Sequence, residues 1–237
     1  MITLIVPVWN EKWRVGPTLI EIRSFVQRHP GIISEVLVVD DGSTDNTVER
    51  VTLYARQLPL TIVKHKTNRG KWAAIWTGIR NAKNDAIIIM DADGSAPITV
   101  FDDENLPHLI KQEVVLFGSR FAKGSVVQGK GAFRNFISQG YRLYVGFWYA
   151  VATGKRVSDM QCPLKLIYRK HLGDLSTVIN ERWAGDIELA IRIAKKEVQI
   201  HTLPIEFIHK SGSKVSKLAI LQMAWHTAKT SLIYLLK

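Results

Sequence analysis

Two apolar segments of this chain each end abruptly in acidic residues. Residues 36–39 lead into Asp40 and Asp41, and about 50 positions later residues 86–90 lead into Asp91 and Asp93. Short β-branched runs of this kind are typical of strands buried on both faces of a parallel sheet. In open α/β sheets, ligands bind where such strands end. The sequence therefore predicts an acidic ligand site at one edge of a mostly parallel sheet.

Strand and helix patterns alternate along the chain. Segments with strand character cover residues 2–8, 35–40, 60–65, 85–91, 113–118, 165–168 and 198–203. Between them, apolar residues recur at helical spacing, as Leu19, Ile22 and Val26 do. This alternation predicts an α/β fold in which helices cover both faces of the sheet.

The charge balance points to an acidic partner. The chain has 32 Lys and Arg against 21 Asp and Glu, a net charge of +11, which suits nucleic acid, an anionic membrane or phosphorylated substrates. Zinc-finger spacing, an RNA-recognition signature and a basic helix-turn-helix pattern are all absent from the sequence, which argues against nucleic acid. The alternative to an enzyme is a basic protein that binds an anionic membrane or nucleic acid without catalysis.

The second half of the chain contains two long apolar segments. Residues 132–152 are apolar on nearly all sides, but the uncharged run 143–154 is too short to span a bilayer. Beyond residue 215, Leu221, Trp225 and Leu232 belong to a stripe at alternating spacings of three and four, with lysines nearby. Two interpretations are open: a helix lying in a membrane interface, or a helix packed on the protein or on a second subunit.

These motifs resemble those of family 2 glycosyltransferases, which have the GT-A fold. The similar segments are 5–11 (IVPVWNE), 38–45 (VVDDGSTD), 68–71 (NRGK), 91–95 (DADGS), 118–120 (GSR), 185–189 (GDIEL) and 212–215 (GSKV). Within the family, the last four segments are most similar to the polyprenyl-phosphate sugar transferases, the dolichyl-phosphate glucose and mannose synthases. The resemblance implies one GT-A domain over 1–213, with a Rossmann-like nucleotide-sugar half (1–95) and an acceptor half (96–213), followed by an amphipathic helix over 214–237.

The resemblance also implies a donor site that contains Mg²⁺ or Mn²⁺. Asp91 and Asp93 would bind the ion, with Ser95 at or near its coordination shell, and the ion would neutralise the departing nucleoside diphosphate. The expected nucleotide-sugar contacts are Pro7, Trp9, Glu11, Asp40, Asp41, Lys71, Asp91, Ala92 and Asp93.

On the acceptor side, the resemblance implies cations in place of a general base. A sugar hydroxyl must lose a proton during attack, whereas a polyprenyl phosphate is already anionic. The expected acceptor-phosphate contacts are Arg120, Arg134, Ser138 and Lys214. Asp186 is assigned a positioning role and forms the expected catalytic set with Asp91, Asp93 and Arg120; a local alternative is that Asp186 only caps a helix.

The sequence thus predicts an inverting transferase that moves a hexose from a nucleotide diphosphate sugar to a polyprenyl (dolichyl) phosphate. UDP-glucose is the favoured donor and GDP-mannose the second. Transfer to a saccharide or lipid hydroxyl, with Asp186 or Glu188 as base, is a further alternative. We expect peripheral binding to an anionic membrane at its cytoplasmic face and no nucleic-acid partner. The sequence does not decide whether the protein forms a homo-oligomer.

Overall fold

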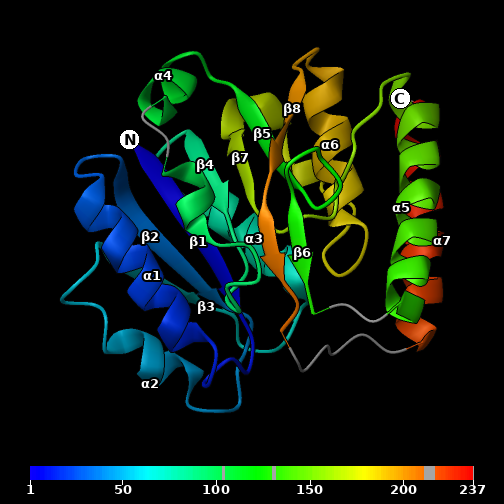
Figure 1. The fold of residues 1–237 in the computed structure, drawn as a ribbon. Coiled ribbons are helices and arrows are strands. Elements are labelled where there is room, and N and C mark those ends of the chain that lie inside the picture. The colour runs from blue at the N-terminus through cyan, green and yellow to red at the C-terminus, as the bar shows by residue number, and fades with distance from the viewer. Residues whose placement is uncertain (103–104, 130–131, 211–216, 237) are drawn as a thin grey trace.

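The computed structural model describes residues 1–102, 105–129, 132–210 and 217–236, without the side chains of 132–137 and 217–218 (Figure 1). Its elements, in chain order, are β1 (Ile2–Val8), α1 (Val15–Arg28), β2 (Ile33–Asp40), α2 (Thr47–Thr52), β3 (Leu60–Lys64), α3 (Lys71–Asn81), β4 (Ala86–Ile89), η1 (Ile98–Phe101), α4 (Leu106–Lys111), β5 (Val115–Ser119), β6 (Val126–Gln128), α5 (Ala132–Thr153), β7 (Lys165–Tyr168), η2 (Arg169–Leu172), η3 (Leu175–Thr177), α6 (Gly185–Lys195), β8 (Ile200–Pro204), β9 (Glu206–Ile208) and α7 (Lys217–Leu235).

A seven-stranded sheet in the order β3-β2-β1-β4-β7-β5-β8 forms the centre of the molecule. All of its described pairings are parallel except those of β7, which runs antiparallel to both β4 and β5. The predicted α/β class and mostly parallel sheet are therefore confirmed. The small parallel pair β6-β9 was not predicted, because its strands have three residues each and β6 is exposed along its length.

The sheet is buried because helices cover both of its faces. Strand β1 is buried at every position, and β2 at all but one. Helix α1 follows β1 toward one end of the sheet, whereas α3 follows β3 and returns across β2 and β1 to β4. Right-handed crossovers in opposite directions place their helices on opposite faces, and Figure 1 shows α1 in front of the sheet and α3 behind it.

Helices α5 and α7 lie side by side at the end of the molecule beyond α6 (Figure 1). The side of α7 that packs on α5 and α6 contains mainly small polar residues, with Thr227, Thr230 and Ser231 all buried. The predicted apolar stripe faces outward, and the side chains of Leu221 and Trp225 are 69% and 67% exposed. One face of this helix thus packs on the protein, whereas the described residues of the stripe are uncovered, and binding to a membrane interface stays a prediction. Among the described helices, none combines the length and apolar character needed to cross a membrane.

Candidate active site

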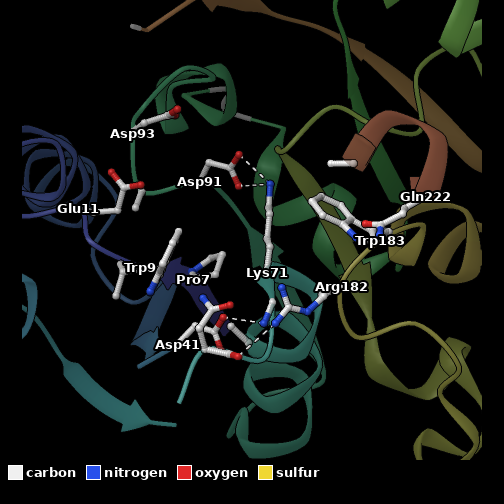
Figure 2. Close-up of a pocket in the computed structure, with 16 residues that line it drawn as sticks. Pro7, Trp9, Glu11, Asp41, Lys71, Asp91, Asp93, Arg182, Trp183 and Gln222 are labelled. Atoms are coloured by element: carbon white, nitrogen blue, oxygen red, sulfur yellow. Dashed lines mark hydrogen bonds and ion pairs between the residues drawn. The ribbon is translucent and has the colours of Figure 1, made fainter. Parts of the chain in front are cut away.

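A cavity of about 480 Å³ lies where β1, β2 and β4 end (Figure 2). Eight of the nine predicted nucleotide-sugar residues line it: Pro7, Trp9, Glu11, Asp41, Lys71, Asp91, Ala92 and Asp93. They come from segments up to about 85 positions apart in the sequence. The structure therefore brings the expected donor residues together at the predicted edge of the sheet.

The centre of the cavity holds an ion pair. The Lys71 ammonium, at the first position of α3, lies 2.6 Å and 2.8 Å from the two carboxylate oxygens of Asp91 (Figure 2). Desolvation lowers the pKa of Lys71, but the negative charges of Asp91, Asp186 and Asp93 outweigh it and raise that pKa. Lys71 therefore remains a cation at neutral pH, beside the carboxylates expected to bind a metal.

The donor atoms at this site fit Mg²⁺ or Mn²⁺. Asp91 and Asp93 are each about one quarter exposed, and both line the cavity. No cluster of three or more His, Cys, Asp or Glu side chains suited to a metal occurs among the described residues. Two carboxylates supply the hard oxygen donors that these ions prefer, and Mg²⁺ usually completes its shell with substrate phosphates and water.

Glu11 and Ser95 flank the two aspartates in different ways. The Glu11 carboxylate receives hydrogen bonds of 2.6 Å from Arg14, and a terminal nitrogen of Arg14 lies 4.0 Å from Asp93. Ser95 is buried, its backbone amide donates to Asp93 over 2.9 Å, and its carbonyl accepts from the amide of Ile208. Ser95 thus shapes the loop that carries Asp93, and it is not among the described lining residues of the cavity.

The neighbouring acids Asp40 and Asp41 have different surroundings. The Asp40 carboxylate faces its own loop, where it accepts from the amide of Ser43 over 3.2 Å, and it is not among the described lining residues. The Asp41 carboxylate lines the cavity and accepts from the amides of Arg69 and Gly70 over 2.9 and 2.7 Å. Asp41 therefore also fixes the loop that leads into α3.

Asp186 is held by groups that the sequence did not reveal. It lies in the first turn of α6, which begins at Gly185, and it does not cap that helix. Its oxygens accept from the ammonium of Lys165 over 2.8 Å and from the indole of Trp72 over 3.2 Å. Gly185 permits this contact, because a Cβ there would lie 2.1 Å from the Trp72 ring. Asp186 thus has a fixed orientation and a buried cationic partner.

Arg120 is paired inside the protein. Its guanidinium makes two hydrogen bonds, of 2.8 and 2.9 Å, with the fully buried carboxylate of Asp159. Desolvation opposes the charged form, but Asp159 outweighs it and raises the pKa of Arg120. Ser138 is half-buried on α5. The Arg134 side chain and Lys214 lie outside the described residues, so the predicted acceptor-phosphate set is placed only in part.

Glu188 is the centre of a buried polar network. Its carboxylate accepts from the amides of Ile179 and Asn180, from the guanidinium of Arg192 and from the hydroxyl of Tyr234 on α7. The side chain of Glu188 has no exposed surface. Glu188 therefore joins α6, the segment before residue 181 and the C-terminal helix, and it is not among the described lining residues of the cavity.

The wall of the cavity opposite Trp9 was not predicted. It contains Arg182 and Trp183 from the segment before α6, and Ala219 and Gln222 from α7 (Figure 2). Arg182 and Trp183 lie two to three positions before the acidic segment 185–189, and that proximity was the only sequence signal that they belong to the site. Nothing in the apolar stripe of α7 indicated that its first turns reach this cavity.

The sequence matches known proteins over nearly its whole length. Residues 3–156 match the family model "Glycosyl transferase family 2". A human dolichyl-phosphate beta-glucosyltransferase is 31% identical over 90% of this chain and 69% of that protein. A dolichyl-phosphate beta-glucosyltransferase of Trichomonas vaginalis is 29% identical over 94% of this chain and 68% of the relative.

Solved structures share the fold at low sequence identity. Glucosyl-3-phosphoglycerate synthase from Mycobacterium tuberculosis, in complex with Mn²⁺, UDP and phosphoglyceric acid, superimposes with a TM-score of 0.70 at 15% identity, over 99% of this chain and 78% of that one. TarS of S. aureus in complex with UDP-GlcNAc gives a TM-score of 0.63 at 15% identity, over 99% of this chain and 70% of that one.

Proposed function

The chain belongs to glycosyl transferase family 2. We propose that it transfers glucose from UDP-glucose to a polyprenyl phosphate such as dolichyl phosphate. The observation that carries the proposal is the gathering of the expected donor residues around one cavity at the carboxyl edge of the sheet. The dolichyl-phosphate beta-glucosyltransferases named above support the choice of sugar and acceptor. We propose that the reaction inverts the anomeric configuration of the sugar in a single displacement step.

On the donor side, Asp91 and Asp93 would hold Mg²⁺ or Mn²⁺. Such an ion supplies Lewis-acid stabilisation of the negative charge on the departing nucleoside diphosphate. The Lys71 ammonium provides a second positive charge at the same place, because it lies against Asp91 within the cavity. Trp9, Pro7 and Asp41 form the end of the cavity where the nucleoside would lie.

On the acceptor side, the geometry favours a phosphate over a hydroxyl. A hydroxyl acceptor needs a carboxylate that can take its proton. Glu188 cannot contact a substrate, because it is buried and both of its oxygens accept internal hydrogen bonds. Asp186 remains, and its contacts with Lys165 and Trp72 suit a group that positions the sugar or the acceptor.

The acceptor phosphate would meet a clamp of polar groups near α5. Arg120 and Ser138 are its described members, and Arg134 and Lys214 are proposed from the sequence. Because Arg120 is already paired with Asp159, its guanidinium would interact with both that carboxylate and the acceptor phosphate. The unpaired positive charge of the clamp would then have to come from Arg134 and Lys214.

The function is tested by assaying purified protein with radiolabelled UDP-glucose and dolichyl phosphate in detergent, with EDTA, Mg²⁺ or Mn²⁺. We expect a metal-dependent, acid-labile β-linked glucosyl phospholipid. GDP-mannose and free saccharide acceptors are the comparison substrates. Product from GDP-mannose alone, or transfer to a saccharide hydroxyl alone, would contradict the proposal.

We also propose that the protein works peripherally at the cytoplasmic face of an anionic membrane, where its acceptor resides. The net charge of +11 and the uncovered apolar residues of α5 and α7 support this: Leu143, Phe147, Leu221, Trp225, Leu232 and Leu235. A long isoprenoid tail stays in the bilayer, since each CH₂ withdrawn from it costs about 0.8 kcal/mol.

Leu221→Glu is expected to weaken binding to anionic vesicles by about 10-fold or more, because the burial of a leucine contributes about 1.5 to 3 kcal/mol. Adding Trp225→Glu should weaken it further, as measured by co-sedimentation at several salt concentrations. Leu53→Glu is the matched control, since Leu53 is a similarly exposed leucine at the end of α2. Equal binding by all variants would contradict a membrane role for the stripe.

A further inference from the structure

We propose that the C-terminal helix α7 supplies the subsite for the donor hexose, with Gln222 as the residue that hydrogen-bonds the sugar hydroxyls. The inference rests on the proposed function and deepens it. It assigns a specificity-determining role to a helix whose outward face is the candidate membrane surface.

The layout of the cavity carries the first step. Figure 2 shows Trp9 and Pro7 at one end, the Lys71–Asp91 pair in the middle, and Trp183 with Gln222 at the opposite end. A nucleotide sugar presents base, ribose, diphosphate and hexose in that linear order. If the diphosphate lies at the charged middle and the nucleoside beside Trp9, the hexose must lie toward Gln222.

The chemistry of this end suits a neutral sugar. Trp183 is half-buried and offers an aromatic surface against the C–H face of a hexose. The carboxamide of Gln222 offers two N–H donors and one acceptor oxygen, and it carries no charge to repel the neighbouring diphosphate. Gln222 is an exposed residue that lines the cavity, and within the described part of the chain its carboxamide has no hydrogen-bond partner in the protein, so a ligand that enters the cavity can reach it.

Polar contacts hold the helix that carries Gln222 against the rest of the protein. The Tyr144 hydroxyl donates to the carbonyl of Ala224 over 2.9 Å, and the Asn180 side chain donates to Thr230 over 2.7 Å. Asn180 lies three positions before Trp183, so the same bond ties the helix to the segment that carries the tryptophan. The two halves of the subsite are thus held relative to each other before a ligand binds.

The test compares the affinities of UDP and UDP-glucose by calorimetry with Mn²⁺ present, for wild type and for Gln222→Leu. The leucine keeps a similar size but cannot hydrogen-bond. We expect UDP affinity to stay within about 2-fold and UDP-glucose affinity to fall about 2- to 12-fold, the range for the loss of one neutral hydrogen bond. Discrimination between UDP-glucose and UDP-galactose in kcat/KM should narrow as well.

Two further variants make the result decisive. Gln222→Ala should behave like Gln222→Leu, which separates a lost hydrogen bond from a steric clash. Gln112→Leu, at an exposed glutamine next to α4, is the matched control and should leave both affinities unchanged. Thermal melting at the wild-type temperature shows that each variant is folded.

Three outcomes would overturn the assignment. An equal loss for UDP and UDP-glucose would place the nucleoside, not the hexose, beside Gln222. Unchanged affinities for both ligands would remove Gln222 from the donor site. A wild-type protein that binds neither ligand would contradict the proposed function itself, so failure of the function is told apart from failure of the subsite by the wild-type measurement.

Discussion

Replacing Asp91 by asparagine is expected to lower glucosyl transfer by about 10²- to 10³-fold, the usual loss when one group that stabilises transition-state charge is removed. The substitution keeps the shape of the side chain and removes the charge that would hold a divalent cation. Activity is measured by initial rates at saturating metal, with an EDTA-treated wild-type sample beside it.

The matched control for this substitution is Asp102→Asn. Asp102 is an aspartate of similar exposure that pairs with Arg28 and His29, and it does not line the cavity. Its replacement should leave transfer unchanged. Wild-type rates for Asp91→Asn, or full activity of a metal-free preparation, would remove Asp91 from the metal site.

Glu188→Ala is expected to lower the free energy of unfolding by about 3 to 5 kcal/mol, because it leaves the buried guanidinium of Arg192 without its anionic partner. For a chain of this size, that loss corresponds to a melting temperature lower by about 6 to 20 °C. Scanning calorimetry or thermal circular dichroism measures it directly.

Glu181→Ala is the control, because Glu181 pairs with Arg69 at the surface and such a pair contributes about 0 to 1 kcal/mol. Arg192→Met should then cost less stability in the Glu188→Ala background than in the wild type, since the two residues are coupled. A melting temperature of Glu188→Ala equal to that of Glu181→Ala would show that the network contributes little.

The fold could be predicted because its central strands have an unambiguous pattern. Strands β1, β2 and β4 are buried and apolar, and the last two lead directly into acidic residues. The predicted bounds agree with the structure to within two residues at each end of β1, β2 and β4. By contrast, β6 and β9 are too short and too exposed to give a pattern.

The candidate site could be predicted where it depends on strand ends, and not where it depends on packing. Lys165 resembles a surface lysine in the sequence, yet it is buried against Asp186. The reason is the direction of β7: because the strand is antiparallel, its first residue lies opposite Ile89, at the edge where the parallel strands end. Spacing along the chain does not encode that direction.

The acidic pair of α6 shows a similar limit. Asp186 and Glu188 are two positions apart, which on a helix separates their side chains by about 200°. They therefore cannot serve one site together: Asp186 contacts Lys165 and Trp72, whereas Glu188 contacts Arg192 and Tyr234. Helical geometry alone could have separated their roles once the start of α6 was known.

The position of β7 also affects how the chain is made. Strand β7 lies between β4 and β5 in the sheet, yet about 75 residues separate it from β4 in the sequence. During synthesis at about 5 to 20 residues per second, one edge of the apolar strand β4 therefore stays uncovered for about 4 to 15 s. Uncovered apolar edges pair readily with other chains. The nascent protein is therefore expected to be most prone to aggregation during this interval, and in a fragment that ends before residue 165 this edge of β4 would stay without β7.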